Sequence, residues 1–310
     1  MILWAAACAG ESNTGLATAG GDARQYLCGF KAMIRDWRDQ WHIGTAGASD
    51  PAFGFGWVQL NSCDRAVWEE SRTVPAVPVR TNWSYQNPAV DPGPSGSDPL
   101  GAWRPTSTTS SCKRGQPRGT PCRGQGDGFP SVRWAFTQSL VLKNTFQAVI
   151  VDTPSAYGSV HSPFKQPAGS RLARGALSTI YNMTGFDTSP TVKHVALTAS
   201  AGVVVTLTGL GAGGRIEPPR AAAGFELLCK DTWHSALVNA ASIAGATITL
   251  PLPAGCVAPR AIRYIWYDTP CSNYPYMCPI YVTAPALGGL SGELDSLPLG
   301  PFILSISSSR

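Results

Sequence analysis

Hydrophobic and polar positions divide the first 60 residues into a helix and a strand. Large apolar side chains recur at helical spacing from Tyr26 to Trp41, with charged residues elsewhere on the wheel. This pattern predicts an amphipathic helix packed on a core. The run FGFGWVQL at Phe53–Leu60 predicts a strand, and the apolar residues Ile2–Trp4 predict the end of an earlier one. Strand, helix, strand in this order favours a βαβ unit with a parallel sheet.

Residues 73–128 interrupt the pattern. They hold nine prolines and eight glycines with almost no aliphatic periodicity, which predicts a long surface loop or insertion. Order returns at Gly128–Trp134, after which we expect a helix and then a buried strand, FQAVIV, at Phe146–Val151. Leu172–Ile180 has the composition of a further helix.

The character of the chain changes again after about residue 185. Short β-rich runs separated by Gly and Pro turns occupy 194–198, 203–207, 246–252, 261–267 and 302–306. Such runs are typical of an antiparallel sandwich or sheet. The pattern therefore predicts an α/β region over residues 1–185, containing the 73–128 insertion, and a β-rich region over residues 186–310.

The composition of the chain narrows the functional classes. Its net charge of +5 is spread along the length without a basic cluster, which argues against a nucleic-acid partner. No stretch is long and apolar enough to span a membrane. Nine cysteines occur without a Cys-x-x-Cys pair or zinc-ligand spacing, which favours disulfides over a metal site. No cofactor is expected.

Two acceptor triplets for N-glycosylation, at Asn82 and Asn182, point with the cysteines to an oxidising compartment. The start, MILWAAACAG, has no basic region and too short an apolar run for a signal peptide. We therefore expect a secreted or lysosomal protein whose signal peptide is not in this sequence.

His161 is the strongest candidate for catalysis. It lies in a Gly- and Ser-rich segment after the predicted strand Phe146–Val151, where α/β enzymes place their chemistry. Imidazole can take and return a proton near neutral pH. Asp152, at the end of the same strand, is the nearest carboxylate that could orient it. A polar surface histidine and a turn-forming aspartate are the plainer interpretations.

A second candidate is the small-residue turn formed by Gly10, Glu11, Ser12 and Asn13, which could direct donors toward an oxyanion. An ordinary helix cap is the alternative. The chain contains no Gly-x-Ser-x-Gly nucleophile elbow.

Several motifs taken in order resemble the sialate O-acetylesterase family of SGNH-type esterases. They begin with GESN at Gly10–Asn13, continue through FGFGWVQL, and include GSVHSPFK at Gly158–Lys165 followed by Arg171-Leu172. The closing part adds GFE, RYIW, CPIY and PF, at Gly224–Glu226, Arg263–Trp266, Cys278–Tyr281 and Pro301–Phe302.

The resemblance implies an SGNH-hydrolase-like parallel sheet with helices, incomplete at its N-terminus, plus the C-terminal β-rich region. The family removes O-acetyl groups from sialic acids with a serine nucleophile. His161 would then be the general base, Asp152 the orienting acid, and Gly10–Asn13 the pocket lining near the oxyanion. The resemblance also implies disulfides between Cys271 and Cys278 and between Cys229 and Cys256. The substrate would be an O-acetylated sialic acid or another acetylated carbohydrate.

The sequence also departs from the family. The family's nucleophile stands in a Gly-Gln-Ser-Asn block upstream of the motif that GESN matches, and this block is absent. The helix after GESN belongs after the family's second block, which argues against Ser12 as the nucleophile. We therefore expect the 310 residues to be inactive as an esterase. The alternatives are a glycan-binding protein without catalysis and an incomplete gene model, which the upstream transcript would reveal.

Overall fold

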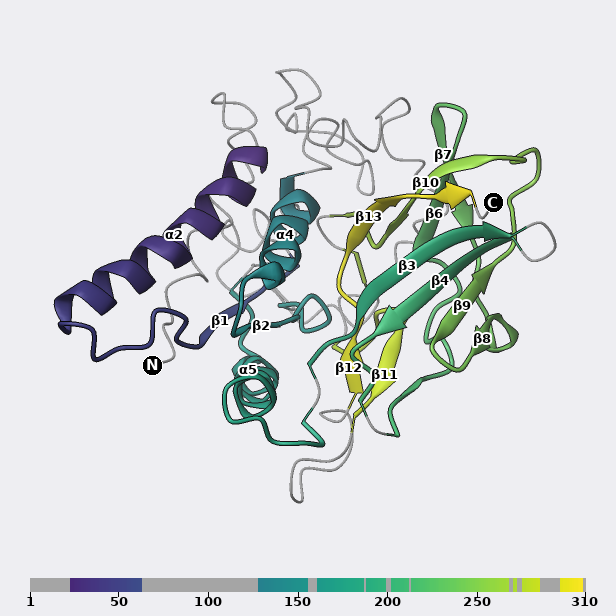
Figure 1. Ribbon diagram of the computed structural model, residues 1–310. Helices are drawn as coiled ribbons and strands as arrows, with labels where there is room; N and C mark the ends of the chain where they lie inside the picture. Colours follow the sequence, from purple (N-terminus) through teal and green to yellow (C-terminus); the bar gives the residue numbers. More distant parts are fainter. Residues whose placement is uncertain are drawn as a thin grey trace, which may run out of the picture.

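The computed structural model describes residues 23–62, 128–155, 161–186, 188–198, 202–211, 213–267, 270–271, 275–284 and 296–308. Its helices gather on one side and its antiparallel sheets on the other, as Figure 1 shows. The predicted strand at Ile2–Trp4 and the 73–128 insertion, up to residue 127, lie outside the described residues.

The predicted first helix is confirmed as α2, Ala23–Gly44. Its inner face buries Phe30 and Ile34, while Arg38 near the C-terminal end donates hydrogen bonds to the carbonyl oxygens of Phe53 (2.7 Å) and Lys143 (2.8 Å). Trp41 was expected on the core face but is 45% exposed. The last turns of α2 extend beyond the elements that cover its earlier turns (Figure 1). The apolar face of α2 therefore continues past the point where the core ends.

A parallel pair of strands forms the centre of the helical side. β1 (Phe55–Val58) pairs with β2 (Thr145–Ala148) in the register Gly56 to Phe146. The predicted parallel sheet is thus confirmed for two strands, and the wider SGNH-like sheet stays a prediction. Both strands are shorter than their apolar runs, because the chain turns after Ala148 while Val149 and Val151 remain buried.

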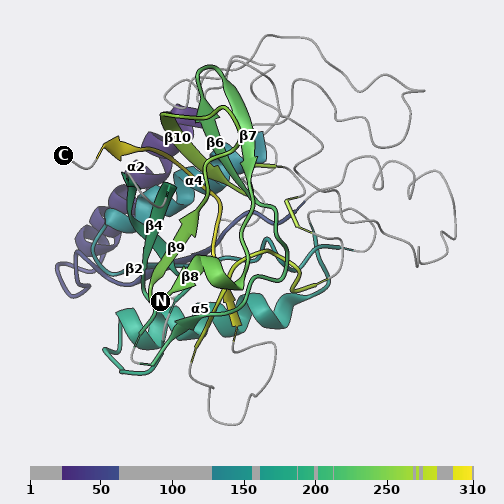
Figure 2. The same cartoon turned by 90° about the vertical axis from the view of Figure 1, so that its right-hand side faces the viewer.

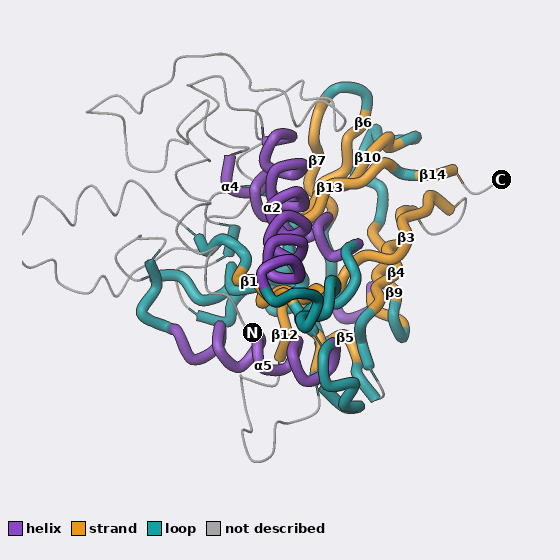
Figure 3. The backbone as a smooth tube through the Cα atoms, turned by 60° about the vertical axis from the view of Figure 1, so that its left-hand side comes forward, coloured by secondary structure: helices purple, strands orange, loops and turns teal. Residues whose placement is uncertain are grey.

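Helices cover both faces of this pair, as parallel strands require. α2 and α4 (Gly128–Gln138) lie side by side (Figure 3) and enclose an aromatic cluster that includes Phe30, Trp57 and Phe136. The short 3-10 helix η2 (Ser139–Val141) follows α4. α5 (Lys165–Thr179) packs on the opposite face through Leu172.

The structure corrects the position of the helix predicted before the strand Phe146–Val151. We expected a helix after Trp134, whereas Gly128–Trp134 is itself the first part of α4. Pro130 lies in the first turn, where the missing N–H of a proline removes no helical hydrogen bond. The proline therefore marks the start of this helix rather than a loop before it.

Among the described residues, the β-rich side forms three sheets, and this side faces the viewer in Figure 2. The first has the order β13-β10-β6-β7, the second β12-β11-β5, and the third β14-β3-β4-β9-β8. All their pairings are antiparallel except β14 with β3, which confirms the antiparallel prediction for this part. The strands are β3 (Thr191–Thr198), β4 (Gly202–Thr208), β5 (Arg215–Ile216), β6 (Phe225–Cys229), β7 (Thr232–Ala236), β8 (Ile243–Ala244), β9 (Thr247–Leu250), β10 (Pro259–Tyr264), β11 (Tyr281–Thr283), β12 (Ser296–Pro298), β13 (Phe302–Ser305) and β14 (Ser307–Ser308), and η3 (Ala240–Ser242) is a short 3-10 helix.

The two sides share their interior. Val149 and Val151, which follow β2, belong to the same buried cluster as strands of the β-rich side. Arg133 of α4 donates a hydrogen bond to the carbonyl oxygen of Tyr267 (2.7 Å), just after β10. The segment after β2 is therefore held between the helices and the β-rich sheets, and the boundary at residue 185 stays a prediction.

Candidate active site

The carboxyl ends of β1 and β2 meet in a set of buried polar contacts. Asn61 donates its side-chain N–H to the carbonyl oxygen of Thr153 (2.8 Å), and Ser62 donates its hydroxyl to that of Val151 (2.8 Å). Asn61, Ser62 and Thr153 are all buried. Because both strands end at one edge of the sheet, their following segments run together at the position where α/β proteins build their sites.

Arg133 fixes the segment after β1. Its guanidinium is fully buried and donates to the carbonyl oxygens of Leu60 (2.8 Å) and Asn61 (2.7 Å) as well as to that of Tyr267. A charged donor group that satisfies three carbonyls costs less to bury than an unpaired charge. Arg133 therefore ties α4, the end of β1 and the segment after β10 into one unit.

Asp152 follows β2 and is completely buried. Its carboxylate receives two parallel hydrogen bonds from Arg171 of α5, Nη1 to Oδ1 at 2.6 Å and Nη2 to Oδ2 at 2.8 Å. Arg171 also donates to the carbonyl oxygen of Val149 (2.6 Å). Burial by itself lowers the pKa of Arg171, but the charge and hydrogen bonds of Asp152, with smaller effects from Tyr281 and Tyr276, raise it overall. The guanidinium thus stays charged.

His161 lies between these two paired residues in the sequence and is exposed. The next residue, Ser162, is buried and makes hydrogen bonds with one residue before His161 and one residue after it. Its hydroxyl donates to the carbonyl oxygen of Pro154 (3.5 Å) and accepts the N–H of Phe164 (3.2 Å), just before α5. An exposed imidazole on an anchored segment has access to solvent and to an arriving ligand, which a proton-transfer group requires.

The remaining predicted site residues divide into two groups. Gly10, Glu11, Ser12, Asn13 and the acceptor Asn82 lie outside the described residues, so their roles stay predictions. Asn182 is exposed in the turn after α5 and has a positive φ of 53°. The structure forms both implied disulfides, Cys271–Cys278 and Cys229–Cys256.

Within the described ranges, no three His, Cys, Asp or Glu side chains gather in a way that suits a metal ion. Among the same residues, no helix has both the length and the apolar character needed to cross a membrane.

Sequence reasoning missed the buried arginines. Arg171 belongs to one of the family motifs and Arg133 lies within Gly128–Trp134, but neither is assigned a role from the sequence. No local signal marks Arg171 as buried, because an arginine next to a leucine can equally face solvent; only once it is buried does it need a paired partner. The partner itself, 19 residues earlier in the chain, could be found only from the fold.

Comparisons with known proteins identify sequence relatives that are sialate O-acetylesterases. No family model matches the chain. Mouse sialate O-acetylesterase is 26% identical over 296 residues, covering 91% of this chain and 41% of the mouse protein. The human sialate O-acetylesterase is 27% identical over 299 residues, covering 91% of this chain and 43% of the human protein. The chain therefore spans less than half the length of these curated relatives.

A solved structure shows the same fold. The crystal structure of a carbohydrate acetylesterase from Xanthomonas citri has a TM-score of 0.59 and 23% sequence identity to this chain. The match covers 95% of this chain and 48% of the other. The arrangement of helices and antiparallel sheets described above is thus shared with a larger protein.

Proposed function

We propose that this chain, which resembles the sialate O-acetylesterases as its motifs predicted, carries the general base of a carboxylic-ester hydrolase that removes O-acetyl groups from sialic acids or other acetylated sugars. Esterase relatives over 91% of the chain support the reaction class. The observation that carries the proposal is the placement of His161, exposed on a segment anchored by the Asp152–Arg171 pair beyond the second parallel strand.

In the proposed reaction, a serine hydroxyl oxygen attacks the carbonyl carbon of the acetyl group while His161 accepts the proton of that hydroxyl. The imidazolium then returns the proton to the departing sugar oxygen, leaving an acetyl-serine ester. Water, deprotonated in turn by His161, releases acetate and regenerates the serine. Donors at Gly10–Asn13 would stabilise the negative oxygen of each tetrahedral intermediate.

Asp152 has a particular part in this proposal. A carboxylate has about four acceptor positions, and that of Asp152 already accepts three hydrogen bonds, two from Arg171 and one from Tyr281. We therefore propose that Asp152 orients His161 mainly by fixing the backbone on both sides of it. This role differs from direct pairing with the imidazole, which stays a prediction.

The 310 residues themselves are expected to turn over no ester, because no Gly-Gln-Ser-Asn block occurs in them. The test is acetate release from O-acetylated sialic acid and from 4-nitrophenyl acetate by the purified chain. His161→Ala and Ser12→Ala are compared with His194→Ala, an exposed histidine on β3 that serves as the matched control. Hydrolysis lost in His161→Ala but kept in Ser12→Ala and His194→Ala would support the base and contradict the expected inactivity.

Hydrolysis that persists in His161→Ala would refute the assigned base.

The second candidate function is glycan binding without catalysis. Binding of an acetylated sialoside by an inactive wild-type chain, measured by calorimetry, would support that alternative.

We also propose a secreted or lysosomal location. The two disulfides support an oxidising compartment, since such bonds persist there and are rare in the cytosol. Expression in a secretory host with and without glycosidase treatment tests this proposal, with Asn82→Gln and Asn182→Gln identifying the occupied acceptor. Absence of any mass shift would contradict glycosylation.

A further inference from the structure

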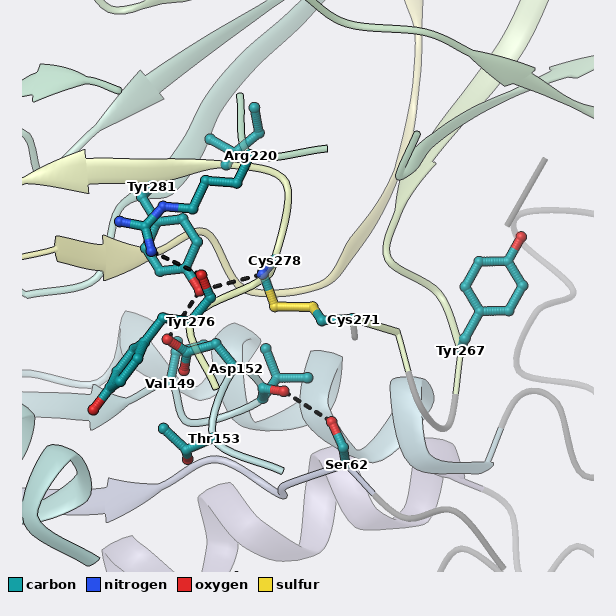
Figure 4. Close-up of a disulfide and its surroundings, with 12 residues drawn as sticks. Ser62, Val149, Asp152, Thr153, Arg220, Tyr267, Cys271, Tyr276, Cys278 and Tyr281 are labelled. Atoms are coloured by element: carbon teal, nitrogen blue, oxygen red, sulfur yellow. Dashed lines mark hydrogen bonds between the residues drawn. A yellow bond between two sulfur atoms is a disulfide. The ribbon is translucent and has the colours of Figure 1, made fainter. Parts of the chain in front are cut away.

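The mechanism leaves one group of buried and half-buried side chains around Asp152 without a role. Figure 4 shows Tyr281, Tyr276 and the Cys271–Cys278 disulfide gathered beside Asp152, with Arg220 on the far side of the Tyr281 ring. These residues come from the β-rich side of the molecule, whereas Asp152 follows β2. Their contacts therefore link the β-rich sheets to the segment that carries His161.

Tyr281, the first residue of β11, is 1% exposed and uses its hydroxyl twice. The hydroxyl donates to Oδ2 of Asp152 (3.1 Å) and accepts the backbone N–H of Cys278 (3.2 Å). The guanidinium of Arg220 stacks on the ring at 3.8 Å from its centre. Burial and then the charge of Asp152 raise the pKa of the Tyr281 phenol well above its ordinary range, so it remains a neutral donor.

The backbone of Asp152 is held from the same side. The N–H of Tyr276 donates to the carbonyl oxygen of Asp152 at 2.7 Å. Tyr276 lies between Cys271 and Cys278, which are joined by a disulfide, and the carbonyl of Tyr276 accepts a hydrogen bond from Arg220 (2.7 Å). The main chain of Asp152 is thus fixed by Tyr276, inside the disulfide-closed segment, and its carboxylate by Tyr281, three residues after that segment.

On the opposite side, Arg171 holds the other two hydrogen bonds of the carboxylate. Asp152 and Arg171 are 19 residues apart and His161 stands between them in the sequence. The pair therefore links the two ends of the stretch that contains His161. The hydrogen bond from Tyr281 to Asp152 fixes the position of this pair relative to the β-rich core. A shift of Asp152 would be passed to His161 through Pro154, whose carbonyl oxygen accepts a hydrogen bond from the hydroxyl of Ser162, the residue after His161 (3.5 Å).

We propose that Tyr281 is a positioning residue for His161, acting through Asp152 and the Cys271–Cys278 segment. This inference rests on the proposed function in taking His161 as the base. Tyr281→Phe keeps the ring but removes the donor to Oδ2 and the acceptor for the Cys278 N–H. Because misplacement of a catalytic group by about 1 Å can cost about 100-fold in rate, we expect kcat to fall about 10- to 100-fold.

Tyr264→Phe provides a matched control. Tyr264 in β10 is also fully buried, and its hydroxyl accepts the backbone N–H of Ile280 at 3.0 Å, two residues from Cys278. The two variants lose comparable buried hydroxyls, but the contact with the Asp152 carboxylate belongs to Tyr281. A merely structural role would give both variants the same effect.

The experiment records the ring signals of the four histidines by NMR, assigning those of His161 with His161→Gln. Tyr281→Phe is expected to move the ring chemical shifts of His161, while Tyr264→Phe leaves them unchanged. Cys271→Ser/Cys278→Ser should reproduce the effect of Tyr281→Phe, and Cys229→Ser/Cys256→Ser should not. If ester turnover is measurable, kcat should fall in Tyr281→Phe with KM nearly unchanged.

Unaltered His161 signals in folded Tyr281→Phe, or equal shifts in Tyr281→Phe and Tyr264→Phe, would overturn the inference. The proposed function fails in a different way, namely if turnover survives in His161→Gln while the NMR response to Tyr281→Phe is still observed. The two ideas are therefore tested separately, because the NMR readout does not require activity.

Discussion

The buried pair of Asp152 and Arg171 makes the sharpest energetic prediction. Asp152→Ala leaves the guanidinium of Arg171, itself 3% exposed, without its carboxylate, and Arg171→Met leaves the carboxylate without two donors. Removing one partner of a buried ion pair costs about 3–5 kcal/mol. Each single variant should therefore lose about 3–5 kcal/mol of unfolding free energy.

The double variant Asp152→Ala/Arg171→Met should be less destabilised than the sum of the two, because it leaves no unpaired buried charge. From the two short hydrogen bonds we expect a coupling free energy of about 3 kcal/mol, at the upper end for contacting residues. The hydroxyl of Tyr281 and the carbonyl of Val149 lose a partner in the double variant, so it should remain below the wild type.

Urea unfolding at pH 7, followed by tryptophan fluorescence, measures all four proteins. The matched control is the surface pair of Arg260 and Asp231, whose side chains are 58% and 86% exposed. An exposed pair should give a coupling of about 1 kcal/mol or less. The reasoning is refuted if Asp152 and Arg171 couple no more strongly than the surface pair.

Three further predictions concern packing, pH and the ends of the parallel strands. Gly175→Ala would place a Cβ 2.3 Å from the ring of Phe146, and overpacking should lower the unfolding free energy by about 1–3 kcal/mol in urea titrations. Above pH 10.0 the unfolded Tyr281 phenol releases its proton while the folded one keeps it. Stability that is fully present below pH 10.0 should therefore fall with rising pH, by about 1.4 kcal/mol per unit more in wild type than in Tyr281→Phe. Asn61→Ala removes the buried hydrogen-bond donor to the Thr153 carbonyl oxygen. It should lower the unfolding free energy, measured by thermal unfolding, by about 1–3 kcal/mol.

Each of these has its own control and contrary result. Gly169→Ala lies on the same helix with no atom within 4 Å of the added Cβ, so it should be neutral or stabilising, and equal losses at both glycines would contradict the packing argument. Parallel alkaline curves for wild type and Tyr281→Phe would show that this phenol does not resist ionisation. Thr145→Ala, which removes a hydroxyl bonded to the Leu142 carbonyl away from the carboxyl ends, is the comparison for Asn61→Ala. An undiminished stability of Asn61→Ala would disprove the role of its amide.

Part of the candidate site could be predicted from local sequence. The apolar run at Phe146–Val151 located the strand that precedes His161, and the motifs around it indicated the family that the relatives confirm. The bounds of this strand were less predictable. Val149 and Val151 are as apolar as the strand residues because they enter the neighbouring core, not because they continue the strand.

The apolar pattern of the sequence also failed to predict strands β6 and β7. Phe225–Cys229 is buried on both faces and therefore lacks the alternation that reveals a half-buried strand. Trp41 shows the opposite error, since its helical spacing was right but no core reaches the end of α2. Periodicity reports which positions could be buried, whereas burial depends on how far the neighbouring elements extend.

The sequence by itself determined the elements whose causes are local. The apolar spacing of α2 and the Pro and Gly turns between the β-rich runs belong to this group. The tertiary structure alone decided the partner of Asp152. A carboxylate next to a candidate histidine suggests a catalytic pair, but Arg171 and Tyr281, 19 and 129 residues away, occupy its oxygens. Pairing of buried charges depends on which side chains the fold brings within hydrogen-bond distance, and no local pattern contains that information.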